Sequence, residues 1–558
     1  MELNLYENLS IEGKILLDDA MRFLEGGYDP RTGFVLVTWD GQPFQSNRAT
    51  LYYALGEMIL RGTSAEIEKP IRAILSRQIQ APGELFHGTF HNPHEAPPVS
   101  DILHADRLGS YGRYFLDIMH ERYTAFLRGK IASSEELRPF LPQLTRMMNE
   151  SLVEAYPVCW KTYEPNSREF ILMGLVMILH YLRPVLSAEL VRDIEKACML
   201  GMEGSLARSA SDFTPINTNI LIMHIFLLDY LGSAFHLPAW QEKSVQLMNQ
   251  LLTDYREFHA VAEFNSPTYC GVDLSTLGFF RRYSGNAYLR DAATELENGI
   301  WADMADFYNP AMENFSGPYS RAYEMDMSVH TCFHALLFLI LGKDRFPRHP
   351  FSIETDNNPL LLLGDPRMDP ALEARFLDPS RPARIRRTFR ELSERGDPAS
   401  CRAVCTCSAY ITPDLMCGCM DGSENPSHQL HPLTVFWRCG SSLGTLKLLR
   451  CLSDGTMDHL HTVLFRGTCE DTTLKMQVEN RCPEVVTLFF EIECPGADRT
   501  VIEPSRWILP GLEIAYTSQR HDLEKEILSE NRIRLMLTMD PRVPDTLLYA
   551  FTLMLRLT

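Results

Sequence analysis

The spacing of apolar residues changes once along this chain, and this change constrains the fold more than any other feature. Over residues 1–345, apolar side chains recur every three or four positions, which is typical of amphipathic helices. Beyond about residue 400 they alternate with polar side chains, and Gly, Pro, Asn and Asp separate the runs, which indicates antiparallel strands. The sequence therefore predicts a mainly α protein with a β domain.

We expect about twelve helices in the first part. They lie near 9–25, 47–61, 64–78, 109–128, 134–154, 167–183, 187–204, 217–232, 238–256, 273–284, 287–308 and 329–342. Gly62, Gly232 and Gly342 fall just past the last periodic residue of three of them, where helices commonly end. Paired helices without a short sequence repeat favour a closed ring, so we expect an (α/α)6-type toroid.

The strands of the second part are expected over 403–416, 433–449, 459–465, 473–479, 485–493, 532–539 and 547–557. Short strands at this spacing, with no helices between them, predict an antiparallel β-sandwich. The residues before them are rich in proline and charge, which indicates a linker. We thus expect a toroid over 1–345, a linker over 346–399 and a β-sandwich over 400–558.

Length and charge exclude several classes of protein. With 558 residues the chain is too long for one hydrophobic core, and its formal net charge of −19 argues against a nucleic-acid partner and an anionic membrane surface. No basic stretch followed by an apolar one is visible at the N-terminus, and the most apolar run, 170–186, is too short to span a bilayer. We expect a cytoplasmic protein without a membrane partner. Homo-oligomerisation stays open.

The 14 cysteines follow no disulfide framework, and we expect them to be reduced. Several occur as Cys-x-Cys near residues 405–419, a spacing that places both thiols on one face of a strand, whereas zinc ligands are usually two to four residues apart. His87, His91 and His94 lie in a loop whose geometry the sequence does not fix. No phosphate-binding or dinucleotide-binding loop stands out, so we expect no metal and no other cofactor.

An irregular stretch at residues 263–274 interrupts the helices. Pro267 lacks a backbone donor and keeps Ser266 out of the helical region, so the helix that ends near His259 cannot continue through it. The stretch carries a carboxylate, an amide, a hydroxyl and a phenol, which must find partners within the protein or bind a ligand. We interpret it as facing a ligand; the alternative is a buried connection between helices.

A helical toroid followed by an antiparallel sandwich resembles the polysaccharide lyase superfamily of chondroitin AC, hyaluronate, alginate and heparinase-type lyases. Those toroids use an asparagine at the start of an inner helix and a tyrosine about fifty residues later. Here Asn219 opens a helix and Tyr269 follows at that spacing, while Arg321 matches a later arginine. The lyases usually place a histidine directly after the asparagine, where this chain has Ile220; His224 is one turn further on.

The resemblance implies an acid/base site. Elimination next to a carboxylate needs that acid neutralised, a base for the α-proton and an acid for the leaving oxygen. Asn219 would bind the carboxylate, Tyr269 would be the acid/base, and Arg321 would lower the pKa of the phenol or bind substrate. His259 is a further catalytic candidate. Residues expected to contact substrate are Glu263, Asn265, His87, Tyr319, Tyr323 and Trp160.

Each of the three main assignments has a structural alternative. Asn219 could be a helix N-cap, Tyr269 a core phenol bonded to a backbone carbonyl, and Arg321 a member of a structural ion pair.

Three functions remain open. The first is a carbon–oxygen lyase or related acid/base enzyme that acts on an oligosaccharide or glycoside. The second is a dehydratase, isomerase or cyclase of specialised metabolism that takes an apolar substrate in the same cavity. The third is a non-catalytic binding protein, which would lack a convergent polar cluster. The absent signal, the absent histidine after Asn219, the acidic charge and the many Met, Phe and Cys residues favour the second. Arginine, lysine and exposed tryptophan in the lining of the inner cavity would favour a saccharide, and continuous Phe, Leu and Met would favour a hydrophobic substrate. The sequence favours the first.

Overall fold

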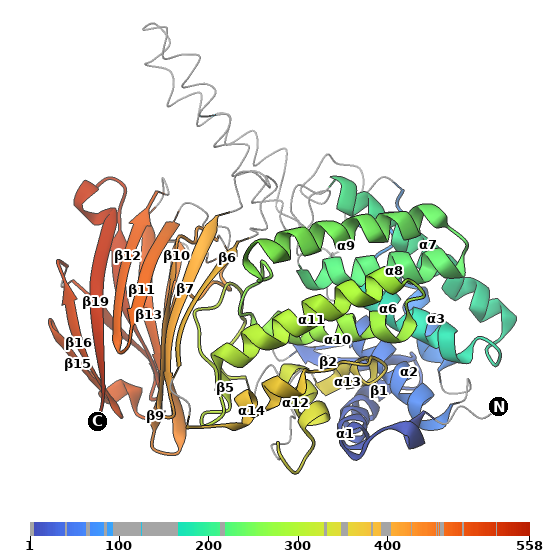
Figure 1. The fold of residues 1–558 in the computed structure, drawn as a ribbon, viewed down its shortest axis with the longest axis horizontal. Coiled ribbons are helices and arrows are strands. Elements are labelled where there is room, and N and C mark those ends of the chain that lie inside the picture. The colour runs from blue at the N-terminus through green and yellow to red at the C-terminus, as the bar shows by residue number, and fades with distance from the viewer. Residues whose placement is uncertain are drawn as a thin grey trace, which may run out of the picture.

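In the computed structural model, a helical part and a β-rich part lie side by side (Figure 1). The structure describes residues 5–39, 42–62, 67–82, 86–92, 124, 166–211, 218–327, 332–346, 355–380, 383–391, 403–425, 427–452, 455, 457, 463–481, 485–520 and 522–558. The helices expected over 109–128 and 134–154 lie outside these ranges, apart from residue 124.

The helical part begins with η1 (Tyr6–Asn8) and ends with α14. Its helices in the described ranges are α1 (Ile11–Gly27), α2 (Asn47–Arg61), α3 (Glu68–Leu75), α6 (Ser167–Leu182), α7 (Ala188–Ser211), α8 (Thr218–Ala234), α9 (Pro238–Phe258), α10 (Pro267–Tyr283), α11 (Ala287–Phe307), α12 (Cys332–Leu341), η5 (Thr355–Asn357), α13 (Asn358–Leu361) and α14 (Pro370–Leu377). Between them lie the short strands β1 (Tyr28–Asp29), β2 (Phe34–Trp39), β3 (Gln42–Ser46), β4 (Tyr308–Asn309) and β5 (Asn314–Phe315).

The helices form a closed ring, which confirms the predicted toroid. α2 packs on α6, α6 on α8, α8 on α10 and α10 on α12, while α1 contacts both α12 and α2. These inner helices are covered by outer partners, with α7 on α6, α9 on α8 and α11 on α10. The distribution of apolar residues explains why some helices are inner and others outer. α6 and α8 are buried on nearly all sides, whereas α9 buries one stripe at helical spacing, from Ser244 to Tyr255.

The β-rich part is an antiparallel sandwich, as predicted. One sheet has eight strands in the order β17-β18-β13-β10-β9-β8-β7-β6, and the other has six in the order β11-β12-β19-β16-β15-β14. Their bounds are β6 (Ala383–Arg390), β7 (Val404–Thr412), β8 (Leu415–Asp421), β9 (Leu433–Cys439), β10 (Ser442–Leu452), β11 (Val463–Glu470), β12 (Thr473–Asn480), β13 (Val486–Glu493), β14 (Val501–Glu503), β15 (Arg506–Leu509), β16 (Leu512–Ser518), β17 (Glu524–Ser529), β18 (Arg532–Met539) and β19 (Leu548–Leu557), with η6 (Ala497–Arg499) and η7 (Pro544–Thr546) between them.

Several expectations differ from the structure, and two of them concern the start of α10 and the boundary between the two parts. Residues 267–274, expected to be irregular, form the first turns of α10, because proline at the first helical position loses no hydrogen bond and Ser266 accepts from the Tyr269 amide as an N-cap. Residues 346–399, expected to be a linker, include α13, α14 and β6. β6 pairs with β7, so the sandwich sheet begins at Ala383.

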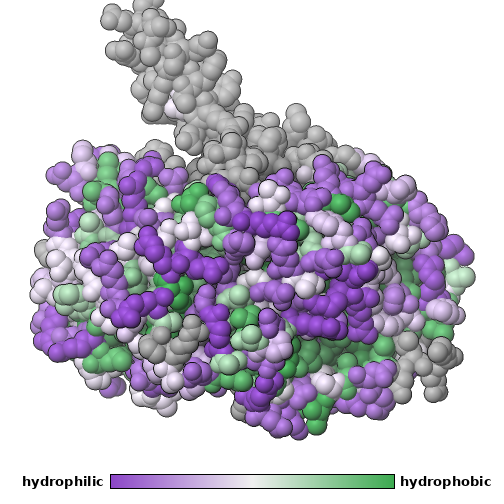
Figure 2. All heavy atoms as spheres, viewed as in Figure 1, coloured by the Kyte–Doolittle hydropathy of each residue, from purple (hydrophilic) through white to green (hydrophobic). Residues whose placement is uncertain are grey.

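The two parts are joined by contacts between β6 and the helices α9 and α11. Arg387 forms an ion pair with Asp303 of α11, and Arg390 pairs with Glu257 of α9. The face shown in Figure 2 is mostly hydrophilic over the described residues, with hydrophobic side chains scattered in small groups. Within the described ranges, no helix is both long and apolar enough to cross a membrane.

Candidate active site

Three chain segments meet at the start of α10. The first, residues 263–269, leads into the helix, and the second, residues 316–323, lies against it. The Ser320 amide and hydroxyl both donate to the Phe264 carbonyl oxygen, at 3.3 and 2.7 Å. The side-chain amide of Asn265 donates to the carbonyl oxygens of Ser316 and Pro318, each at 2.9 Å. These bonds fix the two segments side by side.

The third segment, residues 427–431, comes from the β-sandwich. The Tyr319 amide donates to the His431 carbonyl oxygen at 3.1 Å, and the His431 amide donates back at 3.0 Å. The Ala322 amide donates to the Gln429 carbonyl oxygen at 2.9 Å. The sandwich therefore supplies part of the site, and it orients Gln429 toward the start of α10.

Arg321, Tyr323 and Gln429 surround the Tyr269 hydroxyl, and Glu263 binds Arg321. Arg321 Nη2 donates to the Tyr269 hydroxyl at 3.0 Å, and Gln429 Oε1 and the Tyr323 hydroxyl each lie 3.0 Å from it. Arg321 Nε donates to Gln429 Oε1 at 3.0 Å, and Nη1 forms an ion pair with Glu263 Oε1 at 2.5 Å. We call Glu263, Tyr269, Arg321, Tyr323 and Gln429 the Tyr269 cluster.

Burial raises the pKa of Tyr269. Its side chain is 7% exposed, and burial raises the pKa of the phenol well above its usual value, although the Arg321 charge lowers it. We expected Arg321 to depress this pKa, and the structure shows that desolvation outweighs the cation. Tyr269 is therefore a neutral phenol at pH 7 that can donate a proton.

Tyr323 forms the solvent-facing side of the cluster, since its side chain is 48% exposed. Its amide donates to Thr268 Oγ1 at 3.2 Å, which fixes it to the first turn of α10. Its ring centroid lies 5.9 Å from that of Tyr269. A ligand that approaches Tyr269 from solvent would therefore contact Tyr323.

Two residues expected to contact substrate lie in the core instead. Tyr319 is fully buried, and its hydroxyl donates to the Phe315 carbonyl oxygen at 2.5 Å. Asn265 is 2% exposed, and its amide hydrogens are used by the 316–318 backbone. Both side chains position the backbone that carries the cluster, and neither presents a polar group to solvent.

Asn219 lies near the start of α8, where it is 4% exposed. Its Oδ1 has no hydrogen-bond partner among the residues that the structure describes. α8 and α10 are adjacent and are connected through the outer helix α9, so they run in the same direction and begin at the same end of the ring. Asn219 therefore lies at the end of the ring that carries Tyr269, although no described hydrogen bond joins the two.

The remaining predicted residues make contacts elsewhere. His87 Nδ1 accepts from the Ala81 amide at 3.0 Å, and its carbonyl oxygen accepts from Arg168 Nη1 at 2.7 Å. His259 is the exposed C-cap of α9; its ring packs on Tyr255, and its carbonyl oxygen accepts from Arg387. No described hydrogen bond links either histidine to the Tyr269 cluster. Trp160, His94 and Glu95 lie outside the described residues. Within the described part of the chain, no group of three His, Cys, Asp or Glu residues is arranged to hold a metal ion.

The sequence analysis missed two residues of interest. Gln429 follows Tyr269 by 160 positions and comes from the other part of the chain, so no local motif connects them. Asp273, one turn beyond Tyr269 on α10, is fully buried, and neither carboxyl oxygen has a hydrogen-bond partner in the described ranges. Burial, and then the charge of Glu263, raise the pKa of Asp273 well above its usual value.

A second buried polar network lies in the helical ring. The Ser205 hydroxyl donates to Glu169 Oε1 at 2.6 Å and lies 2.7 Å from His224 Nδ1. Since the hydroxyl has one hydrogen, Nδ1 carries the proton and donates to Ser205. Burial lowers the pKa of His224 to about 4, so the ring is neutral at pH 7.

This network predicts a loss of stability in mild acid. The pKa of His224 is lower in the folded state than in the unfolded state. The neutral ring therefore contributes fully to the free energy of unfolding above pH 6.5, and this contribution, about 3 kcal/mol, is lost as the pH falls towards 4. His224→Asn keeps a donor to Ser205 but does not titrate, so its unfolding free energy should change less between pH 7 and 4.5. Denaturant unfolding at both pH values measures this. The exposed His236→Asn is the control and should behave like the wild type. An unchanged pH dependence in His224→Asn would contradict the assignment.

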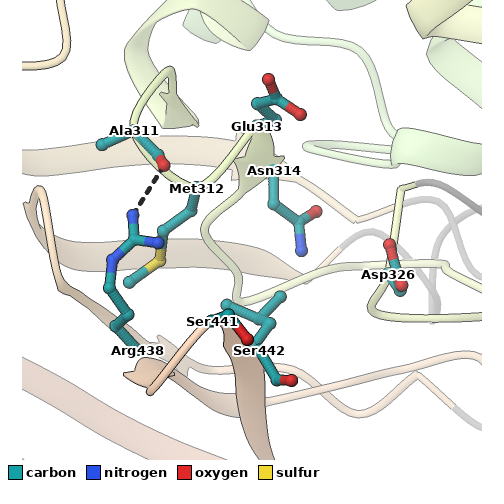
Figure 3. Close-up of a pocket in the computed structure, with 9 residues that line it drawn as sticks. Ala311, Met312, Glu313, Asn314, Asp326, Arg438, Ser441 and Ser442 are labelled. Carbon is teal, nitrogen blue, oxygen red and sulfur yellow. Dashed lines mark hydrogen bonds between the residues drawn. The ribbon is translucent and has the colours of Figure 1, made fainter. Parts of the chain in front are cut away.

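A separate pocket of about 300 Å³ lies between the β4–β5 hairpin and the β9–β10 turn (Figure 3). Arg438 donates to the Ala311 carbonyl oxygen at its edge, at 2.7 Å, and Asn314 and Ser442 line it. None of the Tyr269 cluster residues lines this pocket.

Comparisons with known proteins give one family match and several similar structures. A family model described as a domain of unknown function (DUF8769) matches residues 145–356. A search of curated protein sequences finds no match.

The similar solved structures are polysaccharide lyases. The chondroitin AC lyase of Streptomyces coelicolor A3 is 10% identical, with 97% of this chain and 79% of that chain covered and a TM-score of 0.42. The heparan sulfate lyase of Pedobacter heparinus is 10% identical, with 98% and 88% covered and a TM-score of 0.30. A heparinase III is 10% identical, with 99% and 84% covered and a TM-score of 0.34.

Proposed function

We propose that this protein is an acid/base enzyme of the carbon–oxygen lyase type that acts on an oligosaccharide or glycoside. The observation that carries the proposal is the contact between the buried, protonated Tyr269 phenol and the Arg321 guanidinium, at 3.0 Å. A neutral phenol is a proton donor, and a cation beside it stabilises the phenolate that forms when the proton leaves. A purely structural tyrosine has no need of that cation.

The cluster provides an order of events for elimination. Tyr269 donates its proton to the oxygen that leaves, while the carbon–oxygen bond breaks. The resulting phenolate is held by Arg321 and accepts the proton from the neighbouring carbon, so a double bond forms and the phenol is restored. Glu263 and Gln429 each bind a different nitrogen of Arg321, which fixes its guanidinium toward the phenol.

The surroundings favour a saccharide over an apolar substrate. The cluster consists of charged, amide and phenol side chains, and its exposed member, Tyr323, presents an aromatic face on which a sugar ring can stack. Asn219 adds a buried side-chain carbonyl oxygen, Oδ1. No described residue donates a hydrogen bond to this oxygen, so a hydroxyl or a carboxylic acid of the substrate could be the donor. The convergence of these polar groups also favours an enzyme over a non-catalytic binding protein.

We also propose a cytoplasmic location. None of the eleven cysteines in the described part of the chain is in a disulfide bond, which suits a reducing compartment.

Incubation of the protein with a panel of acidic and neutral oligosaccharides tests the proposed reaction. Elimination yields two fragments whose masses sum to that of the substrate, with a new double bond visible by ultraviolet absorption. Hydrolysis would add one water to that sum, and isomerisation would leave the substrate unfragmented. Either of those outcomes, or binding without turnover, would overturn the lyase proposal.

Gln429→Ala should lower turnover about tenfold. The change removes one of the two acceptors that orient Arg321, and it also removes a hydrogen-bond partner of Tyr269. Initial rates on an oligosaccharide that the panel identifies as a substrate measure the effect. Asn480→Ala is the matched control, since it removes a buried amide of the same sandwich, away from the cluster. Equal rates for Gln429→Ala and the control would show that the sandwich plays no part in the chemistry.

A further inference from the structure

Two cysteines from different sheets of the sandwich lie in direct contact. Cys417 is on β8 of the eight-stranded sheet, and Cys469 is on β11 of the six-stranded sheet. Their sulfur atoms are 3.7 Å apart, and they lie 3.3 and 3.4 Å from the same acceptor, the Asp471 carbonyl oxygen. The two thiols thus face each other across the space between the sheets.

The backbone keeps these strands close at this point. Gly467, two residues before Cys469 on β11, has no side chain, and a Cβ added to it would lie 2.9 Å from the Cβ of Cys419 on β8. The Cys469 amide donates a hydrogen bond to Ser408 Oγ of β7 at 2.8 Å. β11 is therefore fixed against β7 and β8, and the approach of the two thiols follows from the fold.

We propose that Cys417 and Cys469 are a modification site: a dithiol that peroxide oxidises to a disulfide linking the two sheets. A disulfide bond is about 2.05 Å long, so the sulfur atoms need to approach by less than about 2 Å.

The exposure of the two thiols sets the order of the steps. Cys469 is partly exposed, whereas Cys417 is buried. The Cys469 thiolate attacks one peroxide oxygen, the O–O bond breaks, and a sulfenic acid and hydroxide form. Cys417 sulfur then attacks the Cys469 sulfur, the S–O bond breaks, and water leaves. In total, two thiols lose two electrons and two protons, and one hydrogen peroxide becomes two waters.

Cys417 is the second of the two thiols to react. Its hydrogen bond with Cys469, and then its burial, raise the pKa of Cys417 well above the usual value. It therefore stays a protonated, unreactive thiol until a sulfenic acid forms next to it. Deprotonation can then take place as the S–S bond forms, with the proton leaving in the water.

Peptide mapping of the full chain tests this proposal. The reduced protein is treated with hydrogen peroxide, its remaining thiols are alkylated, and it is digested with trypsin without reduction. Cleavage after Arg402, Arg438, Arg466 and Lys475 places Cys417 in peptide 403–438 and Cys469 in peptide 467–475, where it is the only cysteine. We expect a cross-linked pair of these peptides, which reduction separates. Its fragment ions assign the bond to Cys417 among the four cysteines of the larger peptide.

Variants make the test specific. Cys469→Ser and Cys417→Ser should abolish the cross-link, while Cys439→Ser, a partly exposed thiol of β9, should leave it intact. Oxidation should also raise the Tm of the sandwich by about 5 °C or more in the wild type and not in Cys469→Ser. A cross-link that persists in Cys417→Ser, or sulfinic and sulfonic acids at Cys469 without a cross-link, would overturn the proposal. No arm of this test depends on the enzymatic activity proposed above.

Discussion

Tyr269→Phe is expected to lower turnover by about 10²–10⁴-fold, because it removes the proton that we assign to the leaving oxygen. The ring stays in place, so its packing against Tyr323 and under the Arg321 guanidinium, 4.4 Å from the ring centroid, is kept. The free energy of unfolding should fall by about 1 kcal/mol, which is the net contribution of one hydrogen bond. Initial rates and denaturant unfolding on the same preparation separate the two effects.

Tyr319→Phe is the matched control for this variant. Tyr319 is also a buried phenol whose pKa is raised well above its usual value by burial, and it lies two residues from Arg321. Its hydroxyl donates to a backbone carbonyl oxygen, so its loss should cost about the same stability as the loss of the Tyr269 hydroxyl and leave turnover near normal. If Tyr269→Phe gave that same pattern, Tyr269 would be structural and the acid/base assignment would be wrong.

Arg321→Met is expected to destabilise the protein by about 3–5 kcal/mol and to abolish turnover. Arg321 and Glu263 are 8% and 5% exposed, so removal of the cation leaves a buried carboxylate without its ion-pair partner. The Tyr269 hydroxyl loses a donor in the same step. Thermal or denaturant unfolding measures the first effect, and the oligosaccharide assay measures the second.

The double variant Arg321→Met, Glu263→Gln separates stability from chemistry. Replacement of both charged groups removes the buried carboxylate that has lost Arg321, so most of the lost stability should return. Turnover should not return, because no cation remains to stabilise the Tyr269 phenolate. A double variant that regains turnover together with stability would show that Arg321 acts only through folding.

The fold was predictable because it depends on local periodicity. The pattern of apolar residues is a property of consecutive positions, and in the described residues it correctly predicts mainly helices before residue 345 and strands after 400, although the short strands β1 to β5 were not expected. Capping residues also act locally, and α2 begins and ends at the predicted residues, between Ser46 and the left-handed Gly62. The strands β14 to β17 were not expected. They are short, and exposed apolar residues such as Ile527 interrupt the alternation of apolar and polar residues that indicates a strand.

The site was only partly predictable, because its chemistry depends on neighbours that are distant in sequence. Motif spacing brought Tyr269 and Arg321 to attention, and the structure places them in contact. It could not reveal that residues 427–431 of the sandwich contact residues 319–322, nor that the polar groups of Tyr319 and Asn265 bind backbone carbonyl oxygens.

The sequence by itself thus determined which residues form helices and strands, because hydrogen bonding and amphipathic spacing act over a few positions. The direction in which the pKa of Tyr269 shifts was decided by the tertiary structure alone. The pKa of a phenol depends on the balance between the water it loses and the charges it gains, and both are set by the packing around it. Here three segments enclose the phenol, so burial outweighs Arg321 and the pKa of Tyr269 rises.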